Sequence, residues 1–303
     1  MDSVPEADIV SPHLHLPEIR HHVPSTNGSV AMAYDWGGDG PPLVFAHATG
    51  LHSHVWLPTV LALRDRYHCY AVDVRAQGEA TVQTNTPFNW AGVADDFCVS
   101  LDALGLIGHG DLHAVGHSQG GYAVVESARR NPGTFSSVFV YEPVIFAPPT
   151  GAEVGVSTEN QLGILARKRR DVFASRQAAL DNFRGKGPFA PIDEDVLRCY
   201  VHWGFHDLPD GTVSLACRPE HEAALFDQSF TTLFNELAGI DCHVTAAVGE
   251  FTNDNFLTSV PQVVDRLPNA DLVKLPGRTH FGVFEGVVEM AELIHTSLAS
   301  TPS

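Results

Sequence analysis

Short apolar runs alternate with stretches of helical periodicity over most of this chain. Runs bounded by Gly, Pro and polar turns predict strands that are buried on both faces of a sheet. We predict such strands at residues 43–46, 67–73, 112–115, 137–141, 242–248 and 270–275. Between them, helical periodicity predicts helices at residues 55–63, 89–104, 122–130, 256–267 and 285–298. This alternation predicts an α/β fold with a doubly wound, mostly parallel sheet.

The alternation is interrupted in the middle of the chain. The sequence there shows no apolar run like those of the core strands. Pro and Gly instead separate helix-like segments at residues 162–176, 178–183, 193–203 and 220–237. We therefore predict a helical cap over residues 143–238, inserted into a core formed by residues 18–142 and 239–303.

The start of the chain has a different pattern. Residues 19–23 and 29–36 alternate loosely around a turn-rich connection and predict an opening hairpin. Residues 1–17 contain three prolines and no sustained periodicity. We expect a flexible lead-in there.

A Gly-x-Ser-x-Gly sequence lies between one predicted strand and the helix that follows it. Its residues are Gly116, His117, Ser118, Gln119 and Gly120. A serine between a strand and a helix in this way is typical of a nucleophile elbow, in which a strained turn exposes the hydroxyl above the sheet edge. A Cβ at either glycine would collide with neighbouring backbone. Ser118 is therefore the candidate nucleophile.

Two backbone N–H groups could stabilise an oxyanion formed on a substrate of Ser118. Gln119 begins the predicted helix, where N–H groups have no partner within the helix. Thr49 lies in the turn of residues 47–50, which follows another predicted strand. We expect Thr49 and Gln119 to form the oxyanion site.

A serine hydroxyl is a poor nucleophile without a base. The chain has 17 histidines, and His280 is distinguished because it lies between the last predicted strand and the last predicted helix. That position is on the carboxyl edge of the sheet, as is Ser118. Two carboxylates could orient its imidazole. Glu142 directly follows one predicted strand and Asp254 lies in the loop after another, so both remain open.

Ser118, an acid and His280, in this order, resemble the α/β-hydrolase superfamily over nearly the whole chain. Residues 73–78, Asp-Val-Arg-Ala-Gln-Gly, are similar to that family's usual Asp-x-Arg-Gly-x-Gly, with Ala76 in place of the first glycine. Residues 280–285 resemble the histidine loop of its esterase-like branches. The resemblance implies a cap that roofs the pocket, and it implies no cofactor. A serine at the elbow argues against the haloalkane dehalogenase and epoxide hydrolase branches, which attack with aspartate.

The chain also departs from the family pattern. Ala48 replaces the glycine of the usual first oxyanion turn. In many members the acid lies three residues after a glycine like Gly249, but that position here is Thr252, which cannot act as an acid. Certain haloalkane dehalogenases place a carboxylate where this chain has Glu142. The resemblance therefore favours Glu142 over Asp254.

Several side chains could line a substrate pocket, although aromatic residues in a helical cap more often serve packing. The candidates are His47, Phe146, Trp203, Phe205, Phe226 and Phe281. His52 and His54 also lie near the first oxyanion turn. No spacing typical of metal ligands, such as H-E-x-x-H, is present, so we predict no metal site.

Composition restricts the partners. A formal charge of -18 disfavours nucleic acid and anionic membrane surfaces, which select for Lys and Arg. No apolar run approaches the roughly 20 residues of a membrane span. Five scattered cysteines without a C-x-x-C pair, and a start without a basic or apolar leader, predict a cytoplasmic protein. We expect a small-molecule substrate, and the oligomeric state stays open, a homo-oligomer included.

The sequence thus predicts a hydrolase of carboxylic esters or lactones that forms an acyl-enzyme on Ser118. Two other hypotheses remain. The same triad could cleave a carbon–carbon bond in a β-diketone-like compound, or the chain could be a non-catalytic receptor that binds a small ligand on this fold.

Overall fold

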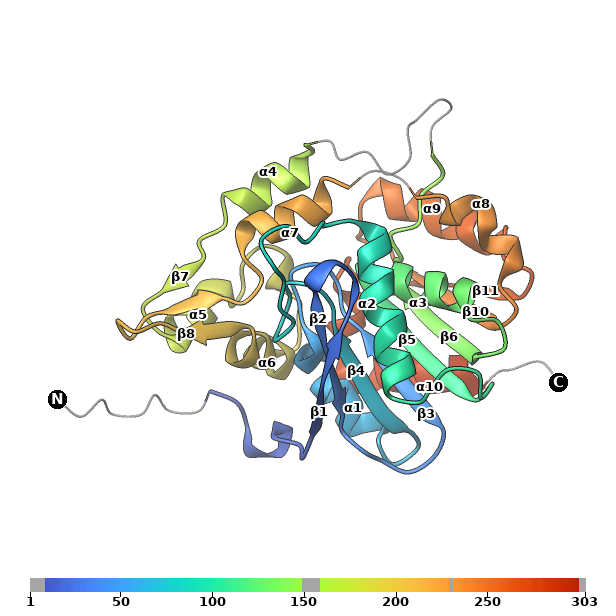
Figure 1. Ribbon diagram of the computed structural model, residues 1–303, viewed down its shortest axis with the longest axis horizontal. Helices are drawn as coiled ribbons and strands as arrows, with labels where there is room; N and C mark the ends of the chain where they lie inside the picture. Colours follow the sequence, from blue (N-terminus) through green and yellow to red (C-terminus); the bar gives the residue numbers. More distant parts are fainter. Residues whose placement is uncertain (1–8, 149–158, 229–230, 300–303) are drawn as a thin grey trace.

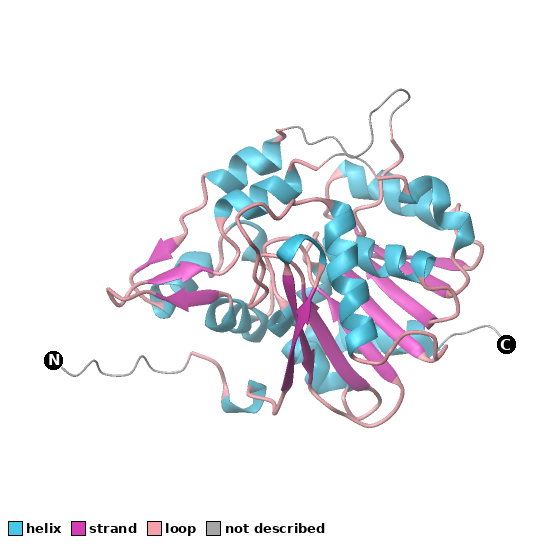
Figure 2. Cartoon of the chain, viewed as in Figure 1, coloured by secondary structure: helices cyan, strands magenta, loops and turns pink. Residues whose placement is uncertain are grey.

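A central eight-stranded sheet organises the computed structural model, which describes residues 9–148, 159–228 and 231–299 (Figures 1 and 2). In spatial order the strands are β1 (Ile19–Pro24), β2 (Val30–Asp35), β4 (His68–Asp73), β3 (Pro42–Ala46), β5 (Leu112–His117), β6 (Phe135–Tyr141), β10 (His243–Gly249) and β11 (Ala270–Leu275). The pairs β1–β2 and β2–β4 are antiparallel, and the other pairs are parallel. The predicted fold class and the opening hairpin are confirmed.

Helices cover both faces of this sheet. They are α1 (Leu57–Leu63), α2 (Trp90–Ala103), α3 (Gln119–Arg130), α9 (Asp254–Val264) and α10 (Val287–Ala299). One hydrophobic core joins the sheet to α2, α3 and α9, and a second joins it to α1 and α10; α2 and α3 lie in front of the sheet in Figure 1. Neighbouring residues of β5 alternate between the cores, with Ala114 in the first and Val115 in the second. This alternation explains why the strand is apolar on both faces.

Residues 159–228 and 231–240, which we call the insertion, begin beyond one end of the strands and end beside α9 (Figure 1). Its helices are α4 (Gln161–Arg167), α5 (Arg176–Phe183), α6 (Glu194–Trp203), α7 (Pro219–Phe226) and α8 (Leu233–Glu236). It also contains an antiparallel sheet of three short strands, β7 (Val172–Phe173), β8 (Phe205–Asp207) and β9 (Val213–Leu215).

This small sheet adds strands that the sequence pattern of a mostly helical insertion did not predict. Its strands have two or three residues each, too few for an alternating pattern to be visible in the sequence. The predicted helices 162–176 and 220–237 are accordingly shorter than expected or divided in two. The predicted cap boundaries at residues 143 and 238 stay a prediction, and residues 149–158 lie outside the described part of the chain.

The flexible lead-in expected for residues 1–17 is wrong for the part that the structure describes. Ile9 and Val10 are 7% and 4% exposed, and Leu14 is fully buried in the core that includes α1. The Ile9 carbonyl oxygen also accepts a hydrogen bond from Arg198 of α6 at 2.7 Å. Apolar anchors spaced without a regular period hold this segment, so periodicity could not reveal them. Residues 1–8 lie outside the described residues.

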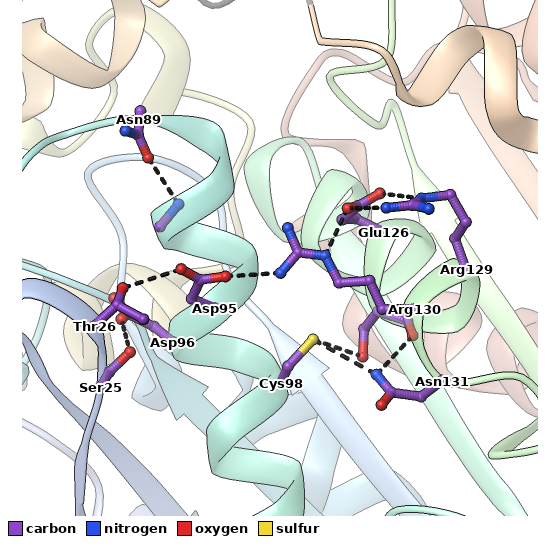
Figure 3. Close-up of polar contacts among 12 residues, drawn as sticks. Ser25, Thr26, Asn89, Asp95, Asp96, Cys98, Glu126, Arg129, Arg130 and Asn131 are labelled. Atoms are coloured by element: carbon purple, nitrogen blue, oxygen red, sulfur yellow. Dashed lines mark hydrogen bonds and ion pairs between the residues drawn. The ribbon is translucent and has the colours of Figure 1, made fainter.

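Charged side chains link α2 to α3 at the surface (Figure 3). Arg130 donates to Asp95 (2.7 Å) and to Glu126 (2.6 Å), and Arg129 donates to Glu126 (2.7 Å). Burial alone would raise the pKa of Glu126, but the hydrogen bonds from the two arginines lower it below its usual value. Partly exposed ion pairs of this kind contribute little stability each.

A second ion pair fixes α2 to the sheet and is fully buried. Arg75, in the turn after β4, donates through Nε to Asp96 Oδ2 (2.9 Å) and through Nη2 to Asp96 Oδ1 (2.8 Å). Both side chains are 0% exposed. Ser25 also donates to Asp96 (2.5 Å), which connects the β1–β2 hairpin to the same carboxylate. A buried charge can be tolerated only with such partners.

We predict that Asp96→Asn destabilises the protein by about 3–5 kcal/mol, because it leaves the Arg75 charge buried without its counter-ion. Urea unfolding followed by circular dichroism measures the loss. The control is Arg66→Ala, which removes an exposed pair with Glu292 (2.9 Å) and should change stability little. Equal losses in the two variants would contradict the prediction.

Candidate active site

Ser118 occupies the turn between β5 and α3. Its φ of 54° and ψ of -111° lie outside the regions that non-glycine residues favour. The Ser118 N–H donates to the Tyr141 carbonyl oxygen (2.9 Å), and the Ser118 carbonyl oxygen accepts from the Val144 N–H (3.1 Å). These two bonds hold the strained turn against the end of β6.

The glycines around Ser118 are required by close backbone contacts. A Cβ on Gly120 would lie 2.1 Å from the Ala46 carbonyl oxygen, and a Cβ on Gly116 would lie 2.6 Å from the Gly120 carbonyl oxygen. Both distances are far below van der Waals contact, and the obstructing atoms belong to backbone. The collision expected from the sequence is therefore confirmed.

Glu142 and His280 form a short hydrogen bond next to this turn. His280 Nδ1 and Glu142 Oε2 are 2.5 Å apart, and Glu142 is 0% exposed. A ring that donates through Nδ1 leaves Nε2 free to accept a proton. Within the part of the chain that the structure describes, Ser118 Oγ itself makes no hydrogen bond to His280.

Asp254 lies elsewhere. It is exposed in the first turn of α9, where a negative charge favours the helix dipole. The neighbouring Asn253 caps this helix by accepting hydrogen bonds from the N–H groups of Asn255 and Phe256. The structure therefore brings Glu142, and not Asp254, to His280.

Sequence reasoning gave no role to the groups that hold the His280 loop. His117 Nε2 donates to the His280 carbonyl oxygen (2.8 Å), and Tyr141 donates to the Thr279 carbonyl oxygen (2.6 Å). Burial lowers the pKa of His117 well below its usual value, so this ring is neutral at pH 7. The Phe256 ring stacks on the His280 ring at 4.6 Å between centroids. All of these contacts join distant segments, so no local pattern signals them.

Thr49 and Gln119 face each other across the predicted oxyanion site. Thr49 Oγ1 donates to Gln119 Oε1 at 2.8 Å, which ties the turn after β3 to the start of α3. Among the hydrogen bonds of the described residues, none uses the backbone N–H of Thr49 or of Gln119. Among the described residues, both N–H groups are therefore left without a protein acceptor.

A buried carboxylate and a buried amide shape this turn. Gln77 Oε1 accepts from the Gly50 N–H (2.7 Å), and Asp73 Oδ1 accepts from the Ser53 N–H (2.6 Å). Asp73 also accepts from the Tyr34 hydroxyl (3.0 Å). The Asp-x-Arg-x-x-Gly stretch was visible in the sequence, but only the structure shows that it supports the oxyanion turn.

The structure does not place His47 as a pocket residue. Its side chain is buried, with Nδ1 donating to the Ala48 carbonyl oxygen (2.9 Å) and Nε2 accepting from the Val74 N–H (3.4 Å). Burial lowers the pKa of His47. The ring is therefore neutral and part of the internal support of the turn.

Two of the predicted pocket aromatics lie near His280. The Phe281 ring is 5.6 Å from the His280 ring, and the half-buried Phe146 ring is 5.5 Å from Phe256, which stacks on His280. Their half-buried faces are available to line an apolar site.

The other predicted aromatics pack away from the imidazole of His280. Trp203 stacks on His54 at 4.6 Å, and Phe205 is buried against Phe173 inside the insertion. Phe226 is half buried at the end of α7. Trp203 and Phe205 thus pack against other rings inside the molecule, and a pocket role for Trp203, Phe205 and Phe226 stays a prediction.

Two further features are absent from residues 9–148, 159–228 and 231–299. Within these ranges, no three His, Cys, Asp or Glu side chains are grouped so that they could hold a metal ion. No helix of the same ranges has the length and apolar character needed to cross a membrane.

We predict that Gly120→Ala destabilises the protein by about 3 kcal/mol or more, the upper end for overpacking, because backbone must move to admit the Cβ. Thermal unfolding measures the effect. Gly239→Ala is the matched control, since a Cβ there meets nothing within 4 Å. If the two variants unfolded at the same temperature, the close packing of the elbow would be refuted.

Comparison with known proteins places this site in a family. The model of the Alpha/beta hydrolase family matches residues 43–293. The 2-(acetamidomethylene)succinate hydrolase of Mesorhizobium japonicum is 26% identical over 258 residues, which make up 84% of this chain and 86% of that protein.

Two solved structures share the fold. The crystal structure of E-2-(acetamidomethylene)succinate hydrolase matches with a TM-score of 0.75 at 22% sequence identity. The match covers 94% of this chain and 100% of that protein's chain. The crystal structure of the esterase RhEst1 from Rhodococcus sp. ECU1013 matches with a TM-score of 0.71 at 20% sequence identity. That match covers 93% of this chain and 99% of the RhEst1 chain. Since the family match spans most of its length, this chain belongs to the alpha/beta hydrolase family and is a hydrolase.

Proposed function

We propose that this protein hydrolyses carboxylic esters through an acyl-enzyme formed on Ser118. The observation that carries the proposal is the 2.5 Å hydrogen bond between His280 and the buried Glu142, next to a serine held in a strained turn. A nucleophile, a base and a carboxylate that orients the base are the parts that acyl transfer needs.

The reaction follows from these positions. Ser118 Oγ attacks the ester carbonyl carbon while His280 Nε2 takes its proton, and Glu142 stabilises the imidazolium that forms. The N–H groups of Thr49 and Gln119 donate to the oxyanion of the tetrahedral intermediate. His280 then protonates the leaving alcohol, and the acyl group remains on Ser118.

Deacylation repeats the same steps with water. His280 Nε2 takes a proton from a water molecule, whose oxygen attacks the acyl carbon, and the proton returns to Ser118 as the acid leaves. The hydrogen bond between Ser118 and His280 forms when substrate is bound, as is common for sites whose catalytic contacts are long in the free enzyme.

The charges around the oxyanion turn support a neutral substrate group. Arg169 of the insertion lies close to this turn, since a Cβ on Gly50 would be 3.4 Å from its Nη1. Arg169 is already paired with Glu222 at 2.5 Å and donates to the Tyr200 hydroxyl at 2.7 Å. The positive charge of Arg169 is therefore compensated. Because the rings of Phe146 and Phe281 are apolar as well, these residues favour a substrate group without charge.

A second candidate is hydrolysis of an N-acyl bond by the same groups. It is favoured by the relative that aligns with 84% of this chain, whose name describes an acetamido compound. The steps are unchanged except that His280 protonates a leaving nitrogen instead of a leaving alcohol oxygen.

We predict that Ser118→Ala abolishes turnover of p-nitrophenyl esters and that Glu142→Gln lowers kcat by roughly 100-fold to 10,000-fold, as loss of an orienting carboxylate does. The matched control is Asp254→Asn, which should leave kcat unchanged because Asp254 is exposed and the His280 ring bonds to Glu142 instead. Initial rates with a short acyl series measure all three. A larger loss in Asp254→Asn than in Glu142→Gln would contradict the assigned acid. If the unmodified protein neither hydrolysed esters nor reacted with a fluorophosphonate probe, the proposed acyl-enzyme on Ser118 would be refuted.

The two candidate substrates are separated by direct comparison. We predict a higher kcat/KM for p-nitrophenyl acetate than for E-2-(acetamidomethylene)succinate, because the compensated Arg169 offers no unpaired positive charge to the two carboxylates of the latter. Parallel rate measurements at one pH, with Ser118→Ala as the blank, decide between them. The reverse order would favour N-acyl hydrolysis.

A further inference from the structure

We infer that Thr252 is a positioning residue that fixes the carboxylate of Glu142 for its work on His280. This role rests on the proposed function. Thr252 Oγ1 donates to Glu142 Oε2 at 2.7 Å, and Oε2 is also the oxygen that receives His280 Nδ1–H at 2.5 Å.

The end of β10 holds both oxygens of this carboxylate. The Gly249 N–H donates to Glu142 Oε1 (2.8 Å), and the Glu142 N–H donates to the Ala247 carbonyl oxygen (2.9 Å). Thr252 supplies the only other donor to Glu142 among the described residues besides His280. Gly249 and Thr252, at the end of β10 and in the loop after it, thus each bind one oxygen of a carboxylate that follows a different strand, β6.

The donor from Thr252 has a specific physical effect. The terminal torsion of a glutamate is broad, so its carboxylate turns unless both oxygens are held. Glu142 is 0% exposed, so water cannot readily replace a missing donor. The donor on Oε2 therefore keeps that oxygen directed at His280 Nδ1 in the short bond.

The test compares Thr252→Val, which keeps the shape and removes the hydroxyl, with Thr252→Ser, which keeps the donor. The readout is the rate at which a fluorophosphonate labels Ser118, measured by intact mass across a pH series, so no substrate need be known. Thr258→Val is the matched control, because Thr258 is exposed on α9. Circular dichroism verifies that each variant is folded.

We expect Thr252→Val to label about 10-fold more slowly, the effect typical of one hydrogen bond to a charged group. Its pH profile should also differ from that of the unmodified protein, because the carboxylate that bonds to the His280 ring has lost one hydrogen bond. Thr252→Ser should restore most of the rate and the original pH profile. A purely structural role for Thr252 would lower the melting temperature without moving the pH profile.

Three outcomes overturn the inference. Equal rates and pH profiles for Thr252→Val and the unmodified protein would show that the hydroxyl does not act on the pair. A slow Thr252→Ser variant would show that packing, and not the donor, matters; this comparison also decides the case if Thr252→Val does not fold. An unmodified protein that the probe does not label would overturn the proposed function itself, and this role with it.

Discussion

The approach of α3 to strands β3 and β5 depends on the absence of side chains at Gly116 and Gly120. Because these residues carry no Cβ, the first turn of α3 lies directly against the carbonyl group of Ala46. The same close approach leaves Ser118 in a strained conformation at the start of α3. The conformation of Ser118 and the position of the turn after β3 therefore depend on one packing constraint.

The second constraint is the pairing of β6 with β10. These strands are parallel and adjacent, with Tyr141 opposite Ala247, so their carboxyl ends lie side by side. A carboxylate that follows either strand can reach the same imidazole. In this chain the carboxylate bonded to His280 follows β6, and the loop after β10 holds Thr252, which donates to that carboxylate. Two neighbouring strand ends thus meet at one imidazole.

Much of this arrangement could be predicted from sequence. The core strands are long enough for their patterns to identify them, and Ser118 and His280 occupy positions that the fold class brings to one edge of the sheet. The acid could not be settled from the residues, because Glu142 and Asp254 both follow strands at that edge. Only side-chain contacts distinguish them.

The remainder escaped prediction because it depends on contacts between distant segments. The strands of the small sheet are too short to carry a pattern. Aromatic side chains such as Trp203 and Phe205 look alike in sequence whether they line a pocket or fill a core. The support of the oxyanion turn by Gln77 likewise depends on a single amide that no periodicity marks.

The segment from Ile9 to Leu14 has a mechanical consequence for the molecule. Leu14 is anchored in the core that contains α1, while the carbonyl group of Ile9 is held by Arg198 of α6 in the insertion. The segment therefore acts as a strap between the two parts. Any motion that moves α6 away from the core around α1 must either extend residues 9–14 or break the hydrogen bond between Arg198 and the Ile9 carbonyl oxygen. The position of α6 is thus coupled to a stretch of chain more than a hundred residues away in sequence.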